Sequence, residues 1–373
     1  MNFAFSEEQL FLREAARRFL DDKMPSERVR ELMATEHGHD PALWQEMAEM
    51  GWQAMAIPEE YGGAGFSFLE LVVILEEMGR VVMPSPFLAT VILAANAIQF
   101  AGSEDQKKEI LSGIAAGETI ATVALTESSG RWDSAGVTAT ATASSDGWTL
   151  NGEKSFVIDG HNADILVIPA RTENGVSLFL VNGDAPGLVK TPQEAMDQTR
   201  KLTYLQLDDV NVGGAALLGA EGDGWSTIER VIQLASVALA AEQVGGSQRV
   251  LDMAVEYAKN RMQFGRPIGS FQAIKHKCAD MLVATESAKS AAYYAGWAAS
   301  EDNEELPIVA PLAKAYCSEA YFMAAAENIQ IHGGIGFTWE HDAHLYFKRA
   351  KSSELMFGDP AYHRSILADR IGI

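Results

Sequence analysis

The sequence predicts an α+β fold of three domains: an N-terminal helical domain (1–119), a middle antiparallel β-domain (120–222) and a C-terminal four-helix bundle (223–373). Helical periodicity of apolar residues dominates the first third, whereas strand-like alternation and turn dipeptides dominate the middle. The helical period returns near Gly224 and continues to the end. A length of 373 residues is typical of two or three domains.

The N-terminal region begins with a helix signal. Ser6 and Gln9 have the spacing of a capping box, in which each side chain serves a backbone N–H of the other residue. Apolar residues then recur at helical spacing from Phe11 to Leu20. Further helices are expected over residues 42–50, 69–78, 87–101 and 104–115. The glycine-rich stretch 58–65 predicts a loop between two of them.

The middle region is typical of strands. Residues 137–143 alternate between Thr or Val and Ala with period two. Asp146-Gly147 and Asn151-Gly152 are tight-turn signals that flank a short strand over 148–150. Further strands are expected over residues 165–169, 176–182 and 203–207.

The C-terminal region predicts four long amphipathic helices. They are expected over residues 227–262, 271–300, 308–331 and 343–357. A glycine-containing break at 264–267 separates the first helix from the second, and another at 332–336 separates the third from the fourth. Long helices joined by short loops are typical of a bundle.

Composition excludes several classes of function. The chain has 29 Lys and Arg against 51 Asp and Glu, a net charge of −22, so a phosphate backbone would be repelled and nucleic-acid binding is not expected. We find no signal peptide and no apolar run of about 18 residues, which predicts a cytoplasmic protein without membrane insertion. Cys278 and Cys317 are too few for a disulfide framework or a four-cysteine zinc site.

The usual signatures of hydrolases, metalloenzymes and dinucleotide folds are missing. The sequence has no P-loop, no G-x-G-x-x-G between a strand and a helix, and no G-x-S-x-G. His341 and His344 are too isolated to name a metal site, so no metal is expected.

Four short motifs occur in a characteristic order together with the loop at 58–63. They are Ala124-Leu125-Thr126-Glu127, Gly152-Glu153-Lys154-Ser155-Phe156-Val157, residues 261–268 with Phe271-Gln272, and residues 330–337. In this order they resemble the acyl-CoA dehydrogenase superfamily of FAD flavoproteins, and the resemblance covers essentially the whole chain. It implies the same three-domain fold and oxidation of the Cα–Cβ bond of an acyl-CoA.

The resemblance implies a set of FAD contacts. In the middle domain they are Leu125, Thr126, Trp132, Asp133, Phe156, Val157 and Ile158. Residues that would reach the FAD of a neighbouring subunit are Arg261, Phe264, Gln272, Gln330, Ile331, Gly333 and Gly334. A guanidinium can neutralise a pyrophosphate, and glycines allow close approach of backbone N–H groups. The resemblance further implies an electron-transfer flavoprotein as acceptor and a dimer or tetramer.

The sequence departs from the family at the catalytic base. The Glu-Gly pair that usually supplies the carboxylate is replaced by Phe357-Gly358, and the alternative position on the first bundle helix is Ala235, followed by Ser236. Ser236, Phe357 and Gly358 would then contact substrate. Ile158 stands where a flavin-contacting threonine is usual, and Trp132 stands where a small residue is usual.

Two nearby carboxylates are candidates for a relocated base. Asp359 lies two residues beyond Phe357, and Glu242 lies two helical turns beyond Ala235. A positioned base contributes about 10²–10⁴ in rate, so its loss without replacement would disable dehydrogenation. The alternative interpretation is structural: Asp359 before Pro360 is a good turn residue, and Glu242 could pair with a neighbouring helix.

The sequence therefore leaves several hypotheses. The first is a subunit of a heteromeric FAD-dependent dehydrogenase in which a paralogue carries the base, by resemblance to bacterial heteromeric enzymes that act on bulky CoA thioesters such as those with steroid side chains. The others are a flavin monooxygenase or nitroalkane-oxidase-like enzyme on the same fold, a non-catalytic subunit that helps its partner hold FAD, and a scaffold that binds neither FAD nor acyl-CoA.

Overall fold

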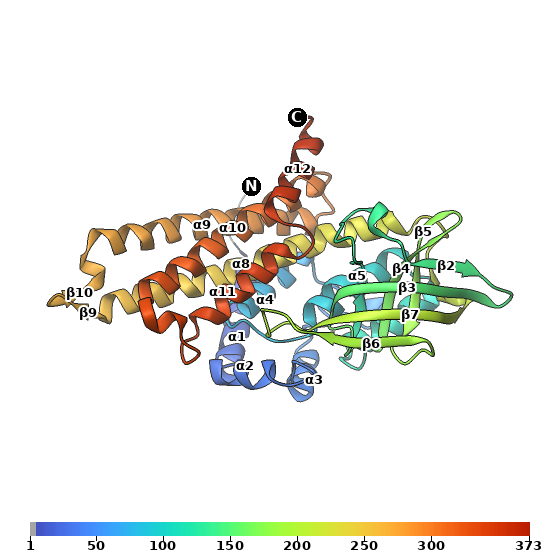
Figure 1. Ribbon diagram of the computed structural model, residues 1–373, viewed down its shortest axis with the longest axis horizontal. Coiled ribbons are helices and arrows are strands. Elements are labelled where there is room, and N and C mark those ends of the chain that lie inside the picture. Colours follow the sequence, from blue (N-terminus) through green and yellow to red (C-terminus); the bar gives the residue numbers. More distant parts are fainter. Residues whose placement is uncertain (1–4) are drawn as a thin grey trace. The chain divides into compact units, whose positions relative to one another are not determined.

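The computed structural model describes residues 5–373, which form two compact units (Figure 1). One unit consists of the N-terminal segment up to Glu31, Phe68–Met83 and Ser236–Ile373, and the other consists of Leu32–Ser67 and Pro84–Ala235. The first unit is helical, and the second contains the β-sheet. The overall class predicted from sequence is confirmed, whereas the three domain boundaries stay predictions.

In the helical unit, the N-terminal segment supplies the first two helices. They are α1 (Glu7–Lys23) and α2 (Ser26–Met33), with α4 (Phe68–Arg80) following later in the chain. The capping box at the start of α1 is confirmed, because Ser6 Oγ accepts from the Gln9 N–H and Gln9 Oε1 accepts from the Ser6 N–H. Helix α2 was not predicted, since it is only eight residues long.

The C-terminal part of the chain contains five α-helices within the described residues, one more than the bundle of four that we expected. They are α8 (Gly224–Asn260), α9 (Gln272–Ser300), α10 (Leu306–His332), α11 (Ala343–Leu355) and α12 (Pro360–Ile371). Helix α10 packs against α9, α11 and α12. The additional helix α12 begins directly after Asp359, which is its N-cap.

Two glycines allow α4 and α8 to cross closely. A Cβ at Gly79 would lie 2.0 Å from the carbonyl oxygen of Glu242, and one at Gly245 would lie 1.8 Å from that of Glu76. Any larger residue at either position would therefore separate the two backbones. The contact places the buried carboxylates of α4 next to the bundle helices.

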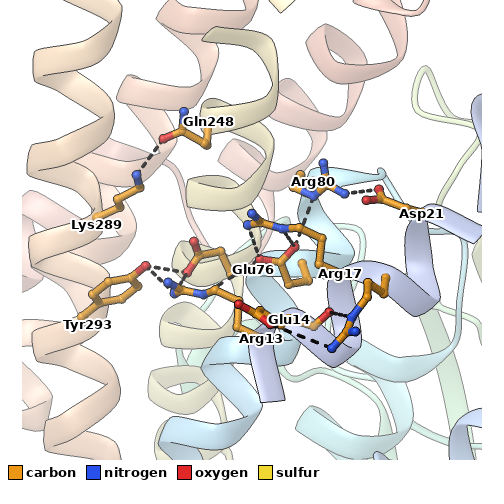
Figure 2. Close-up of polar contacts among 11 residues, drawn as sticks. Arg13, Glu14, Arg17, Asp21, Glu76, Arg80, Gln248, Lys289 and Tyr293 are labelled. Atoms are coloured by element: carbon orange, nitrogen blue, oxygen red, sulfur yellow. Dashed lines mark hydrogen bonds and ion pairs between the residues drawn. The ribbon is translucent and has the colours of Figure 1, made fainter. Parts of the chain in front are cut away.

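Polar contacts fasten α1 to α4 and α9 in the same unit (Figure 2). Arg13 donates to Glu76 at 2.9 Å, and the Tyr293 hydroxyl of α9 donates to the same carboxylate at 2.7 Å. Arg17 binds Glu77 through two hydrogen bonds of 2.9 and 2.7 Å. Burial raises the pKa of Glu76 even though Arg13 and Tyr293 oppose this shift.

The second unit has shorter helices around its sheet. They are α3 (Pro41–Glu49), η1 (Glu59–Tyr61), η2 (Leu88–Ala94), α5 (Ala95–Ala101), α6 (Glu104–Gln106), η3 (Lys107–Leu111) and α7 (Ser112–Ala115). The helices expected over 87–101 and 104–115 are present, but each contains a π-helical segment, η2 or η3. Apolar periodicity does not distinguish such a segment from an α-helix.

The sheet has eight strands in the described part of the chain. Their bounds are β1 (Ala121–Val123), β2 (Thr140–Ala143), β3 (Gly147–Ile158), β4 (Ile165–Thr172), β5 (Gly175–Asn182), β6 (Leu188–Gln193), β7 (Leu202–Gly213) and β8 (Leu217–Leu218). The order is β6-β7-β3-β2-β4-β5-β8, with β1 beside β4 (Figure 1). Most pairs are antiparallel as expected, but β4 pairs in parallel with β1 and β2.

Two strand predictions were wrong in detail. Strand β2 begins only at Thr140, because the short 3₁₀ helix η4 (Ser134–Gly136) precedes it. Asn151-Gly152 is not a turn but lies inside β3, at a register shift against β7. Asn151 bonds to Asp209 of β7, and a Cβ at Gly152 would lie 2.8 Å from Ala139. The glycine therefore serves close strand approach at a bulge.

The remaining elements are short. They are η5 (Gly214–Ala216) before β8, and the hairpin β9 (Met262–Gln263) and β10 (Arg266–Pro267) with η6 (Ile268–Ser270) between α8 and α9. The 3₁₀ helix η7 (Gly333–Phe337) follows α10. Within residues 5–373, no helix combines the length and apolarity needed to cross a membrane.

Candidate functional site

The first two motifs come together in the sheet. Leu125 and Thr126 follow β1, and the Ser155 N–H of β3 donates to the Thr126 carbonyl at 2.8 Å. Leu125 is half-buried and Thr126 is buried. The segment after β1 is thereby held alongside β3.

A buried ion pair reinforces this junction. Lys154 Nζ lies 2.6 Å from Glu127 Oε1, and neither side chain is more than 1% exposed. Lys154 also donates to the Pro169 carbonyl at 2.7 Å, while Glu127 accepts from the N–H groups of Thr138 and Ala139. Burial lowers the pKa of Lys154 to about 8 against the opposing effect of Glu127. Burial alone would raise the pKa of Glu127, but Lys154 and the hydrogen bonds outweigh it and lower that pKa.

Phe156 lies at a bulge that turns its side chain outward. The pairing of β3 with β7 shifts register between Lys154 and Val157, and Phe156 has φ = 55°. Its N–H donates to Gln193 Oε1 at 2.7 Å, and its side chain is 57% exposed. Left-handed backbone in a bulky residue is strained and is often found at functional sites. Val157 and Ile158 are buried directly after it.

The predicted contacts Trp132 and Asp133 lie in the loop before η4. Asp133 is exposed, pairs with Arg131 at 2.5 Å and caps η4 by accepting from the Gly136 N–H. The hydrogen bond and charge of Arg131 lower the pKa of Asp133. Trp132 is half-buried. Asp133 is thus already engaged in organising its own loop.

The third motif is an exposed hairpin on the helical unit. Arg261 precedes β9, and Phe264 at the tip has φ = 53° and is 89% exposed. Phe271, at the start of α9, stacks edge-on against Phe264 and under the guanidinium of Arg266. Gln272 begins α9 and is exposed.

The glycine turn at the end of α10 lies near the root of this hairpin. Tyr257, one turn before Arg261, stacks on His332 with ring centroids 4.2 Å apart. Gly333 has φ = 64°, and a Cβ at Gly333 or Gly334 would meet no atom within 4 Å. Gln330 is exposed and Ile331 is buried. The structure therefore brings the third and fourth motifs together.

This surface offers hydrogen-bond donors suited to an anionic cofactor. Arg261, Gln272 and Gln330 are exposed, and their side chains make no hydrogen bond or ion pair within residues 5–373. Two open glycines lie beside them. A guanidinium, two amides and accessible backbone N–H groups fit a dinucleotide pyrophosphate.

The expected base position is occupied by a buried aromatic side chain. Phe357 follows α11, is 5% exposed and has φ = 57°, and Gly358 has φ = 105°. A Cβ at Gly358 would lie 2.2 Å from the ring of Tyr362, so only glycine fits there. The Asp359 carboxylate accepts from the Tyr362 N–H at 2.8 Å as the N-cap of α12.

The alternative base position, on α8, also lacks a carboxylate. Ala235 and Ser236 are both buried. Glu242, two turns later, forms an ion pair of 2.9 Å with Arg349 of α11, and both side chains are less than 10% exposed. Arg349 also donates to the Met83 carbonyl at 3.4 Å. The geometry of Glu242 is that of a structural ion pair between two helices.

Among the described residues, four lysine or arginine side chains are buried, which the sequence analysis did not predict: Lys154, Arg200, Lys314 and Arg349. Lys314 is the only charged residue between Ile308 and Cys317, and an isolated charge in an apolar helix is the signal that could have identified it. Within the described chain, no group of His, Cys, Asp or Glu side chains is arranged to hold a metal ion.

Comparisons with known proteins match nearly the whole chain. Family models for the acyl-CoA dehydrogenase N-terminal, middle and C-terminal domains match residues 6–118, 122–210 and 222–372. Acyl-CoA dehydrogenase IpdE2 of Mycolicibacterium smegmatis is 35% identical over 356 residues, covering 95% of this chain and 96% of that protein.

Many solved structures match this chain, and two of them are informative here. A chain of the ChsE4-ChsE5 complex from Mycobacterium tuberculosis has a TM-score of 0.92 and 29% identity, covering 100% of this chain and 99% of that one. A chain of a variant of the Tcur3481-Tcur3483 steroid ACAD has a TM-score of 0.88 and 33% identity, covering 98% of both chains. Members of this family are oxidoreductases that act on CH–CH bonds. With all three family models in order and a relative 35% identical along nearly its full length, the chain belongs to the acyl-CoA dehydrogenase family.

Proposed function

We propose that this chain is a subunit of a FAD-dependent acyl-CoA dehydrogenase in which a paralogous partner supplies the catalytic base. The observation that carries the proposal is Phe357, a buried aromatic residue at the position where the family usually has its glutamate. An aromatic ring cannot accept the α-proton of an acyl thioester. The proton acceptor must therefore come from another group or another chain.

The two nearby carboxylates are engaged elsewhere. Glu242 is buried, and its carboxylate is engaged in an ion pair with Arg349. Asp359 uses its side chain to cap α12. These contacts favour a partner as the source of the base.

FAD binding is supported by residues that are exposed and available. Phe156 extends from the β3 bulge, and its neighbours Val157 and Ile158 are held in the sheet. Arg261, Gln272, Gln330 and the two open glycines would hold the dinucleotide of a neighbouring subunit. When bound, FAD supplies the hydride acceptor for Cα–Cβ oxidation. An electron-transfer flavoprotein would be the final acceptor, by resemblance to the family.

The substrate that we propose is a bulky acyl-CoA, with a steroid or branched side chain. The Tcur3481-Tcur3483 relative is described as a steroid ACAD, and its name joins two proteins. The ChsE4-ChsE5 relative is a complex of two proteins. Phe357 would form an apolar wall beside the acyl chain, with Ser236 and Gly358 as further substrate contacts.

The test is anaerobic flavin reduction by an acyl-CoA, followed through flavin absorbance. The chain alone, reconstituted with an excess of FAD, should be reduced at least about 100-fold more slowly than its complex with a base-bearing paralogue. Glu242→Gln and Asp359→Asn should leave the rate of the complex unchanged. Fast reduction of the chain alone that either substitution abolishes would overturn the proposal, because the base would then lie in this chain. Oxygen-coupled turnover of a substrate without CoA would instead favour an oxidase or monooxygenase.

A further inference from the structure

Lys314 is a charged residue inside the apolar core of the helical unit. It lies on α10, is 0% exposed, and has Ala313, Ala315 and Cys317 as buried neighbours. A buried ammonium is costly unless each of its protons is hydrogen-bonded. The hydrogen bonds that this amine donates must therefore serve a purpose at this position.

The three hydrogen bonds of Lys314 point to the turn that contains Phe357. Lys314 Nζ donates to Ser318 Oγ at 3.1 Å, to the Glu354 carbonyl at 3.0 Å and to the Gly358 carbonyl at 3.2 Å. The two carbonyls bracket residues 355–357. A single ammonium thus ties together the two ends of the turn.

The turn needs such a tie because its backbone is strained. The last carbonyls of a helix lack partners within the helix, and here Lys314 satisfies that of Glu354 at the end of α11. Phe357 has φ = 57°, a conformation that persists only when its surroundings enforce it. Lys314 holds the turn from inside, while the ring of Tyr362 packs against Gly358.

The same lysine connects the turn to α8. Ser318 Oγ, which accepts from Lys314, also accepts from Gln243 Nε2 at 3.0 Å. Gln243 is the residue after Glu242, whose partner Arg349 belongs to α11. Glu242 of α8 is therefore linked directly to α11, and the next residue, Gln243, is linked through Ser318 and Lys314 to the turn that follows α11.

We propose that Lys314 is a positioning residue, which fixes the Phe357–Gly358 turn so that Phe357 presents one rigid apolar wall to the bound acyl-CoA. The inference rests on the proposed function for its substrate. The anchoring of the turn rests on the hydrogen bonds alone.

The experiment compares Lys314→Met with Lys289→Met in the full chain. Lys289 is a half-buried lysine of α9 that donates to Gln248, so it is a matched control for loss of a helical lysine. Amide hydrogen exchange is measured along the chain. Losing hydrogen bonds from a charged donor should accelerate exchange in residues 354–360 by about ten-fold or more in Lys314→Met, and not in Lys289→Met.

Acyl-CoA binding is then measured by the spectral change of the flavin-loaded complex. Lys314→Met should weaken acyl-CoA affinity about ten-fold while flavin content per chain stays that of the wild type. Unchanged exchange at 354–360, or an equal rise throughout α10, α11 and α12, would overturn the positioning role. If Lys314→Met does not fold, Lys314→Gln is judged by the same criteria.

The two proposals fail differently. If no protein, including the wild type, binds FAD or acyl-CoA, the proposed function is wrong while selective exchange at 354–360 still supports the anchoring of the turn. If the wild type binds both and the exchange pattern is not selective, the inference about Lys314 alone is wrong.

Discussion

Two fully buried lysines, one in each compact unit, anchor their surroundings in different ways. Lys154, on β3, is paired with the Glu127 carboxylate at 2.6 Å. Lys314, on α10, makes no ion pair within residues 5–373 and is surrounded by two carbonyls and a hydroxyl. Burial lowers the pKa of Lys154 to about 8 and that of Lys314 to about 7.

The difference separates two kinds of anchor. Lys154 and its partner Glu127 are both charged, so removing one leaves the other as an unpaired charge in the core. At Lys314, the acceptors are neutral, so the unfavourable free energy comes from burying the charge of the lysine itself. Removing the lysine leaves polar groups without a hydrogen bond, but it leaves no unpaired charge. The first arrangement stabilises the sheet that would hold FAD, whereas the second fixes one turn.

The largest expected effect is that of Lys154→Met. It leaves the buried Glu127 carboxylate without its cation, so the free energy of unfolding should fall by about 3–5 kcal/mol. Denaturant unfolding of the full chain measures it, with Lys190→Met, at a half-buried lysine of the same sheet, as control. The double variant Glu127→Gln/Lys154→Met should recover part of the loss. A loss under about 1 kcal/mol would mean that the ion pair is not an anchor.

Lys314→Met should cost less, about 1–3 kcal/mol near neutral pH, because it leaves carbonyl oxygens unsatisfied but no charge. The same unfolding measurement applies, with Lys289→Met as control. A cost as large as that of Lys154→Met would remove the distinction between the two anchors.

The pH dependence sharpens the comparison. Between its native pKa of about 7 and the ordinary 10.5, Lys314 is protonated in the unfolded chain but not in the folded one. The unfolded chain then binds more protons, so the free energy of unfolding rises with pH, by at most about 1.4 kcal/mol per pH unit. The stability of wild type relative to Lys314→Met should therefore increase from pH 7 to pH 10. A decrease would contradict the assigned protonation.

Other groups around Lys314 are consistent with this assignment. Those that face it are Glu354, Asp359, Cys317 and His363. Burial raises the pKa of Cys317 to about 12, and burial together with the charge of Lys314 lowers that of His363 to about 3. Neither Cys317 nor His363 therefore titrates between pH 7 and pH 10.

The smallest effect is expected at Asp359. Asp359→Ala removes the N-cap of α12 and should cost about 1 kcal/mol, while Asp359→Asn keeps an acceptor and should cost only a few tenths. Neither should change the flavin reduction rate of the complex. Loss of flavin reduction in Asp359→Asn with unchanged stability would identify Asp359 as a base.

Much of the fold was predictable because local signals determine it. The capping box at Ser6 was sufficient to place the start of α1. Helix α12 was missed because Asp359-Pro360 is a signal both for a turn and for a helix N-terminus, and we chose the turn. Asn151-Gly152 was misassigned for a related reason, since glycine serves tight turns and close strand approach alike.

The position of the candidate site stays a prediction, and the side chains that support its segments were not predicted at all. Motif order indicated Phe156 and Phe357, and both have left-handed backbone in the structure. The side chains that hold these segments could not be identified from sequence, because their partners are distant in the chain. Glu242 and Arg349 are 107 residues apart, and Lys314 and Gly358 are 44 apart.

The most direct test of the central claim is the flavin absorbance per chain of the protein expressed alone, measured in the same run as its size. We predict well under one FAD per chain, rising toward one when a base-bearing paralogue is co-expressed and forms a mixed dimer or tetramer. About one FAD per chain in a homo-oligomer that rapidly oxidises acyl-CoA by itself would contradict the account, because its site would then be complete without a partner.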